Sequence, residues 1–208
     1  MTIATFITDT IKKIETLGIR TPENVDLNAA AEGILGMPEE ILEAMEPDQM
    51  IGMLFAAIGH GIYDYTDWSW QPSSDQVYSF DAEAFDCSNM YTAFLQGISA
   101  ITRGDLEFTD VTEDCSKVDY EKGCGIQTIR FQCNGQAYQY DAAVNYDWFD
   151  TGMLYFINRM IKEMHTGKSL YAISDGYQCC ILFYQTEEWS ERFQQLFGMA
   201  PDDLGKEI

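Results

Sequence analysis

The sequence predicts an α+β fold in which a helical unit precedes a mostly antiparallel sheet. Apolar residues recur at helical spacing through residues 1–66, whereas short apolar or alternating segments typical of strands dominate from residue 76 onward. Two hairpin signals, Asn134-Gly135 and Asp175-Gly176, each separate a pair of such strands. Antiparallel pairing through short turns is therefore expected, with amphipathic helices packed on the sheet.

The composition is that of a folded and strongly acidic protein. The 208 residues are 46% hydrophobic, and 34 acidic against 12 basic side chains give a net charge of −22. Such a charge repels phosphate backbones and anionic lipid, so neither nucleic acid nor a membrane is an expected partner. A basic protein or a cationic small molecule is electrostatically favoured, although the charge could also serve only to keep the protein soluble.

The N-terminus lacks the basic and apolar regions of a signal peptide, and the most apolar segment, residues 50–58, is too short to span a membrane. We therefore expect a cytoplasmic protein of bacterial type. Cysteines in that reducing compartment are rarely paired, and the vicinal Cys179 and Cys180 would point to opposite faces of a strand. The six cysteines are interpreted as buried structural thiols.

Residues 1–66 form a predicted helical unit that packs on the sheet. Helices are expected over residues 2–17, 27–35, 38–45 and 48–62. In the last of these, Gly52 would let a neighbouring backbone approach closely. A stretch rich in Trp, Pro and Ser, residues 67–75, is assigned as a linker, followed by an α+β domain over residues 76–198 and a tail over residues 199–208.

The first half of the α+β domain contains the stronger hairpin signal. Residues 76–83 predict a strand, residues 88–103 a helix and residues 106–111 a short strand. An acidic segment through Asp114 and Asp119 is interpreted as a loop. Asn134-Gly135 then predicts a two-residue turn that pairs Phe131 with Tyr138, with one face of the hairpin apolar and the other polar and either wet or lightly covered.

The second half of the domain repeats this pattern with a more apolar hairpin. Asp147 is a candidate N-cap for an amphipathic helix that ends near Gly167. Asp175-Gly176, taken as a two-residue turn, pairs Tyr171 with Cys180. The strand after this turn is apolar on both faces, so we expect it in mid-sheet, with the N-terminal helices over one face. A closing helix follows.

A short sequence repeat suggests that the domain contains two strand-helix-strand-strand units. Gln76-Val-Tyr-Ser-Phe-Asp-Ala recurs as Gln136-Ala-Tyr-Gln-Tyr-Asp-Ala, and each copy precedes a helix, a glycine and two strands. Two unrelated instances of this common arrangement would look the same. The order of elements is similar to that in effector-binding domains of bacterial multidrug-responsive regulators, but no sequence motif accompanies the similarity and no family is assigned.

No catalytic or metal-binding motif is recognisable. Cys115, Cys124 and Cys133 lack a CxxC pair, and His60 and His165 fall at helix ends, where capping or surface roles are usual. We expect neither a metal nor a cofactor, and we favour a protein without catalytic activity. A carboxylate-dependent hydrolase remains a less favoured alternative, because paired acids are frequent in so acidic a chain.

Two aromatic-acidic segments are the candidate binding sites. The first contributes Tyr63, Tyr65, Asp67, Trp68 and Trp70, and the second, residues 146–150, contributes Asp147 and Trp148. Exposed rings beside carboxylates suit protein contacts or an organic cation. Alternatively, the first segment pins the helical unit onto the sheet, and the second is a helix cap with its hydrophobic staple.

The favoured function is a non-catalytic binding protein whose acidic surface engages a basic protein partner, as an inhibitor or immunity-type protein does. The alternative is a small-molecule module with a groove between the two repeats, lined by Tyr138 and Tyr140, for a cationic or amphipathic ligand. The first function predicts an affinity that falls steeply with salt, and the second predicts thermal stabilisation by such compounds.

Overall fold

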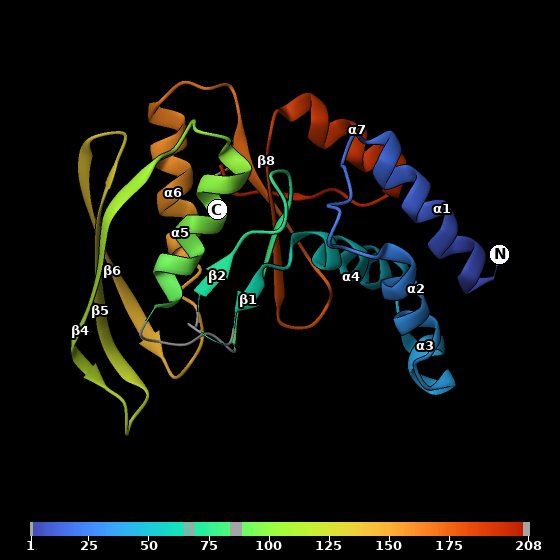
Figure 1. Cartoon of the computed structure of the whole chain (residues 1–208), viewed down its shortest axis with the longest axis horizontal. Coiled ribbons are helices and arrows are strands. Elements are labelled where there is room, and N and C mark those ends of the chain that lie inside the picture. The colour runs from blue at the N-terminus through green and yellow to red at the C-terminus, as the bar shows by residue number, and fades with distance from the viewer. Residues whose placement is uncertain (1, 65, 67–68, 84–88, 206–208) are drawn as a thin grey trace.

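Two main antiparallel sheets and two groups of helices alternate across the molecule (Figure 1). The structure, a computed structural model, describes residues 2–64, 66, 69–83 and 89–205. A three-stranded sheet lies at one end, and α5 (Met90–Thr102) and α6 (Gly152–Glu163) separate it from a four-stranded sheet. The N-terminal helices and α7 (Glu187–Phe197) cover the far side of that second sheet. The predicted α+β class is confirmed, but the strands divide into separate sheets.

The N-terminal part contains four helices, which are α1 (Ile3–Thr16), α2 (Leu27–Leu35), α3 (Glu39–Ala44) and α4 (Pro47–Gly59). Asp26 begins α2 by accepting hydrogen bonds from the backbone N–H groups of Asn28 and Ala29. At the start of α4, the Gln49 side chain accepts a hydrogen bond from the Glu46 N–H at 2.8 Å. None of the described helices has the length and apolar character needed to cross a lipid bilayer.

The four-stranded sheet has the order β3 (Tyr78–Asp81), β8 (Cys179–Gln185), β7 (Ser169–Ser174) and β9 (Asp202–Asp203). Ile181 and Phe183 of β8 pack against the N-terminal helices, whereas Leu182 and Tyr184 belong to the core with α5 and α6. The prediction of a mid-sheet strand covered on both faces is therefore confirmed. The division of the chain into a helical unit and an α+β domain stays a prediction. The predicted boundary after residue 66 falls between β1 (Ile62–Asp64) and β2 (Ser69–Gln71), which pair as a hairpin.

The turn between β7 and β8 differs from its prediction. Tyr171 pairs with Phe183, not with Cys180, so the loop is wider than a two-residue turn. The cause is the Asp175 carboxylate, which accepts hydrogen bonds from the backbone N–H groups of Tyr177 at 2.9 Å and Cys179 at 3.2 Å. Such Asx contacts stabilise a larger turn than the Asp-Gly pair alone indicates.

The three-stranded sheet has the order β4 (Phe108–Asp119), β5 (Cys124–Cys133) and β6 (Gln136–Asn145). The predicted pairing of Phe131 with Tyr138 is confirmed, and Asn134 and Gly135 have φ values of 51° and 80°, as this turn requires. On the outer face, Arg130 Nε donates to Gln139 Oε1 at 3.1 Å, so the predicted polar face is also confirmed.

Two segments flanking this sheet differ from their predictions. β4 continues through Asp114 and Asp119, which were expected in a loop; irregular pairing between Thr109 and Thr112 disrupts the alternation that would have revealed the strand. Asp150, not Asp147, holds the first turn of α6: its carboxylate accepts hydrogen bonds from the Gly152 N–H at 2.9 Å and the Tyr140 hydroxyl at 3.0 Å.

The two predicted repeats exchange their first strands. β3, from the first repeat, pairs with β8 of the second, and β6, from the second repeat, pairs with β5 of the first. The sheets consequently contain equivalent strands in the same order, β3-β8-β7 and β6-β5-β4. This reciprocal arrangement has the form of an internal two-fold symmetry, in which α5 corresponds to α6 and β4 corresponds to β7.

Candidate functional site

The first aromatic-acidic segment lies only partly within the described residues. Tyr65, Asp67 and Trp68 fall outside them, and the backbone of Tyr63 pairs with that of Trp70 in the β1–β2 hairpin. The Trp70 ring is partly buried beside the Tyr78 ring, with 5.6 Å between the ring centroids. It also lies against Gly61, where a Cβ would overlap the indole. Trp70 thus packs the hairpin against β3.

Tyr138 and Tyr140 pack against α6. Their ring centroids lie 6.3 Å and 5.2 Å from that of Phe156, and the Tyr140 hydroxyl donates a hydrogen bond to Asp150. Burial raises the pKa of both phenols above the usual value. Because both rings face α6, they do not line the groove described below.

Asp147 and Trp148 lie at an exposed corner at the end of β6, and two further aromatic residues join them. Trp148 is 40% exposed, Tyr146 is 67% exposed, and Tyr120, from the turn between β4 and β5, is 64% exposed. We call Tyr120, Tyr146 and Trp148 the aromatic corner. All three line one small cavity of about 10 Å³, with Tyr91 beneath it. Sequence segments far apart along the chain therefore present their rings together.

Tyr146 is held in a backbone conformation that bulky residues rarely adopt. Its φ is 54°, in the left-handed region, which costs a non-glycine residue roughly 1–2 kcal/mol. The Tyr146 N–H donates to the Gly123 carbonyl at 2.7 Å, and its ring covers Gly123, where a Cβ would overlap it. Backbone strain of this kind concentrates at functional sites, and the strained residue here carries a largely exposed ring.

Tyr146→Asn is expected to raise the free energy of unfolding by about 0.5–1 kcal/mol, because asparagine tolerates the left-handed region and little buried ring surface is lost. Urea denaturation measures the change. Tyr155→Asn is a matched control, since Tyr155 is also exposed but lies within α6, where asparagine brings no such relief. A Tyr146→Asn variant less stable than the wild type would show that the ring stabilises the fold.

The charge beside the aromatic corner is mainly negative. Asp119 and Glu121 flank Tyr120, and Asp147 separates the two rings at the end of β6. The Lys122 ammonium lies 2.7 Å from the Asp119 carboxylate, and this hydrogen bond lowers the pKa of Asp119. Glu121 and Asp147 are exposed, so acidic side chains surround the three rings.

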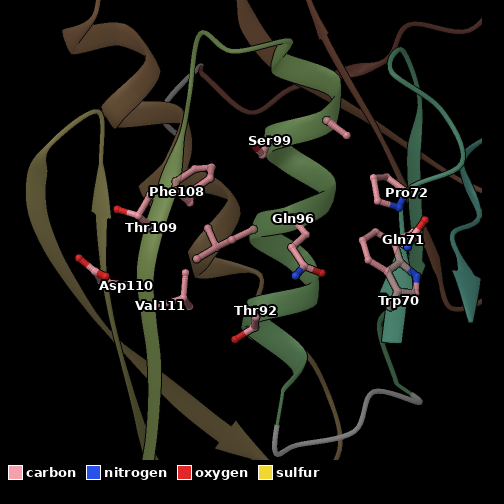
Figure 2. A pocket seen from close by; sticks show the side chains of 12 residues that line it. Trp70, Gln71, Pro72, Thr92, Gln96, Ser99, Phe108, Thr109, Asp110 and Val111 are labelled. Carbon is pink, nitrogen blue, oxygen red and sulfur yellow. The ribbon is translucent and has the colours of Figure 1, made fainter. Parts of the chain in front are cut away.

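A groove of about 540 Å³ runs along α5, between the start of β4 and the end of β2 (Figure 2). Its lining residues are Trp70, Gln71, Pro72, Thr92, Leu95, Gln96, Ser99, Ala100, Phe108, Thr109, Asp110 and Val111. Phe108 turns toward α5, whereas the Asp110 carboxylate turns away and accepts a hydrogen bond from Gln132 Nε2 at 2.7 Å. The interior is therefore apolar with neutral hydroxyl and amide groups.

Glu113 of β4 fixes the first turn of α5, which borders both features. Its carboxylate accepts hydrogen bonds from the Thr92 N–H, the Thr92 hydroxyl and the Gln127 amide, each at 2.7 Å. A carboxylate at a helix N-terminus also interacts favourably with the helix dipole. Met90 and Tyr91 line the cavity of the aromatic corner, and Thr92 lines the groove. The hydrogen bonds from Thr92 to Glu113 therefore help to fix the position of the aromatic corner relative to the groove.

Three of the described thiols, those of Cys133, Cys179 and Cys180, are not activated. Burial raises the pKa of Cys133 to about 11 and the pKa values of Cys179 and Cys180 to about 12, so these groups stay protonated at neutral pH. Cys124 is exposed, contrary to the prediction of buried cysteines, because it lies at the end of β5. Within the described part of the chain, no group of three or more His, Cys, Asp or Glu side chains could hold a metal ion.

Comparison of the chain with family models, curated proteins and solved structures finds no match. The sequence pointed to Asp147 and Trp148, but it did not single out Tyr120. A signal for Tyr120 existed, because the Asn134-Gly135 register, continued along the hairpin, brings Cys124 opposite Asn145 and so places the two ends side by side.

Proposed function

We propose that the chain is a non-catalytic binding protein that engages a basic protein partner through the aromatic corner, as an inhibitor or immunity-type protein does. The observation that carries this proposal is the gathering of Tyr120, Tyr146 and Trp148 around one cavity, with large parts of their rings exposed. Exposed aromatic residues that gather in one place, unlike apolar residues scattered singly over a surface, often mark an interaction site.

The residue types support a protein partner. Tryptophan and tyrosine are enriched among the few interface residues that provide most of the binding energy. Each ring offers a large contact area and few rotatable bonds, and the Tyr146 ring already packs over Gly123 before any partner binds. A surface that is organised before binding loses less conformational entropy on association, which favours affinity.

The charge distribution supports a basic partner. The chain carries a net charge of −22, and no lysine or arginine occurs between Arg20 and Arg103. Acidic residues also lie directly beside Tyr120 and Trp148 in the sequence. Electrostatic complementarity of this kind accelerates association with a basic protein and excludes acidic ones, and it weakens as salt screens the charges.

Trp148→Ala is expected to weaken binding of the partner at least about 30-fold, which corresponds to the loss of roughly 2 kcal/mol for a central interface residue. The partner is first identified by comparing the proteins that wild type and Trp148→Ala retain from cells of the native host. The dissociation constant of the purified partner is then measured by isothermal titration calorimetry at increasing salt concentrations.

Tyr177→Ala is the matched control, because Tyr177 is 60% exposed but belongs to the turn between β7 and β8. It should bind the partner as the wild type does. The proposal fails if every retained protein binds Trp148→Ala and wild type equally. It also fails if the measured affinity does not change with salt.

A further inference from the structure

The C-terminal segment covers the outer edge of β7. Asp202 and Asp203 of β9 pair with β7, and the Leu204 N–H donates to the Leu170 carbonyl at 3.1 Å. Leu204 is buried in the core that includes α6, and the Gly205 carbonyl accepts a hydrogen bond from Lys162 of that helix. The space beside β7 and α6 is thus filled by a short extended segment with a buried leucine.

The internal symmetry identifies the equivalent space in the first repeat. There β4 replaces β7 and α5 replaces α6, and no described strand pairs with the outer edge of β4. Phe108 faces the helices as Leu170 does, and Ala100 of α5 lies at the position of Lys162 in α6. Both Phe108 and Ala100 line the groove. The groove therefore occupies the place that the C-terminal segment fills in the second repeat.

We propose that the groove binds a short extended peptide segment of a partner protein, which adds to the edge of β4 and inserts an aliphatic side chain toward α5. The backbone of the added segment would pair with β4, as β9 pairs with β7. Its aliphatic side chain would lie opposite Phe108, among Leu95 and Val111. Asp110, with a φ of 54°, interrupts regular pairing, so the addition is short, as β9 is.

Charge selects a partner protein over a second copy of this chain. The segment that fills the equivalent space carries Asp202 and Asp203, and a second copy would bring these acids, together with its net charge of −22, to an equally acidic surface. A neutral or basic segment meets no such repulsion. The groove interior is neutral, because the Asp110 carboxylate turns away from it. The bound segment therefore needs no acidic side chain.

A synthetic peptide tests the inference. The probe has the sequence of residues 198–205 with lysine in place of Asp202 and Asp203, and its N- and C-termini are blocked. Titration into the full-length ¹⁵N-labelled protein should shift the amide signals of Phe108–Val111 and of the groove-lining residues of α5, with saturation at a Kd below about 1 mM. A second peptide with serine in place of the leucine should bind at least tenfold more weakly.

Gln96→Trp is the blocking variant, because Gln96 is exposed on α5 and an indole there would fill the groove. It should weaken peptide binding at least tenfold. Gln195→Trp, at an exposed position of α7, is the matched control and should bind normally. Retained dispersion of the amide spectrum verifies that both variants fold. Trp148→Ala should also bind the peptide normally, because the inference does not depend on the aromatic corner.

Four outcomes would overturn the inference. One is the absence of saturable shifts, and another is equal binding by Gln96→Trp and wild type. A third is that the shifts map to the β7 edge, which would mean that the peptide displaces the C-terminal segment. The fourth is a shift of the groove signals with protein concentration alone, which would identify a second copy of the chain as the occupant.

Discussion

Replacing Phe183 with alanine is expected to lower the free energy of unfolding by about 3–5 kcal/mol. The ring is fully buried, and its centroid lies 5.2 Å from that of Phe55, 5.0 Å from that of Trp189 and 5.9 Å from that of Phe193. The substitution would leave a cavity between β8, α4 and α7. Because surrounding residues relax only partly into such a cavity, the lost packing adds to the lost burial.

The same variant tests whether the N-terminal helices fold with the rest of the chain. Phe183 belongs to the core with those helices, whereas the adjacent Leu182 belongs to the core with α5 and α6. A strand shared by two cores couples their stability, so Phe183→Ala should shift one common transition. Urea denaturation followed by tryptophan fluorescence and by far-ultraviolet circular dichroism should give coincident curves.

Ile126→Ala is the control for this experiment, because Ile126 is 38% exposed on the outer sheet, and its loss should change stability by no more than about 0.5 kcal/mol. A loss below about 1 kcal/mol for Phe183→Ala would show that β8 is not the shared strand. Two separate transitions would instead show that residues 1–66 unfold as an independent domain.

The two hairpins show where sequence patterns suffice and where they do not. Asn134-Gly135 specified both the turn and the pairing of Phe131 with Tyr138, because both turn residues adopt the left-handed region readily. Asp175-Gly176 carries a similar signal, but the Asp175 side chain bonds to later backbone N–H groups and opens the turn. Side-chain hydrogen bonds of this kind depend on the local geometry, which a dipeptide pattern does not contain.

Local sequence patterns could not predict the strand exchange or the full aromatic corner, for a related reason. Repeat similarity predicted equivalent units but not that β3 would pair with β8, since the choice of partner depends on packing between distant segments. Trp148 was singled out from its neighbours in sequence, whereas Tyr120 joins it only through the pairing of three strands. Part of the site could be predicted from the sequence, but the complete set of its residues required the tertiary structure.

Gly52→Ala is expected to lower the free energy of unfolding by about 2–3 kcal/mol, the upper part of the range for overpacked sites. The sequence predicted a close backbone approach at Gly52, and the structure confirms it. A Cβ there would overlap the Ser174 carbonyl oxygen and would lie 2.7 Å from the Asp175 Cα. These are backbone atoms, which cannot rotate away as a side chain can, so α4 would have to shift from the sheet.

Gly33→Ala provides the matched control, because Gly33 lies within α2 and a Cβ there would meet no atom within 4 Å. Alanine at this position should raise stability by about 0.5–1 kcal/mol, since it disfavours the unfolded chain and suits a helix. Thermal and urea denaturation of the two variants should therefore give changes of opposite sign. If Gly52→Ala also stabilises the protein, α4 does not pack against the turn between β7 and β8, and the contact between the N-terminal helices and the sheet must differ from the one described.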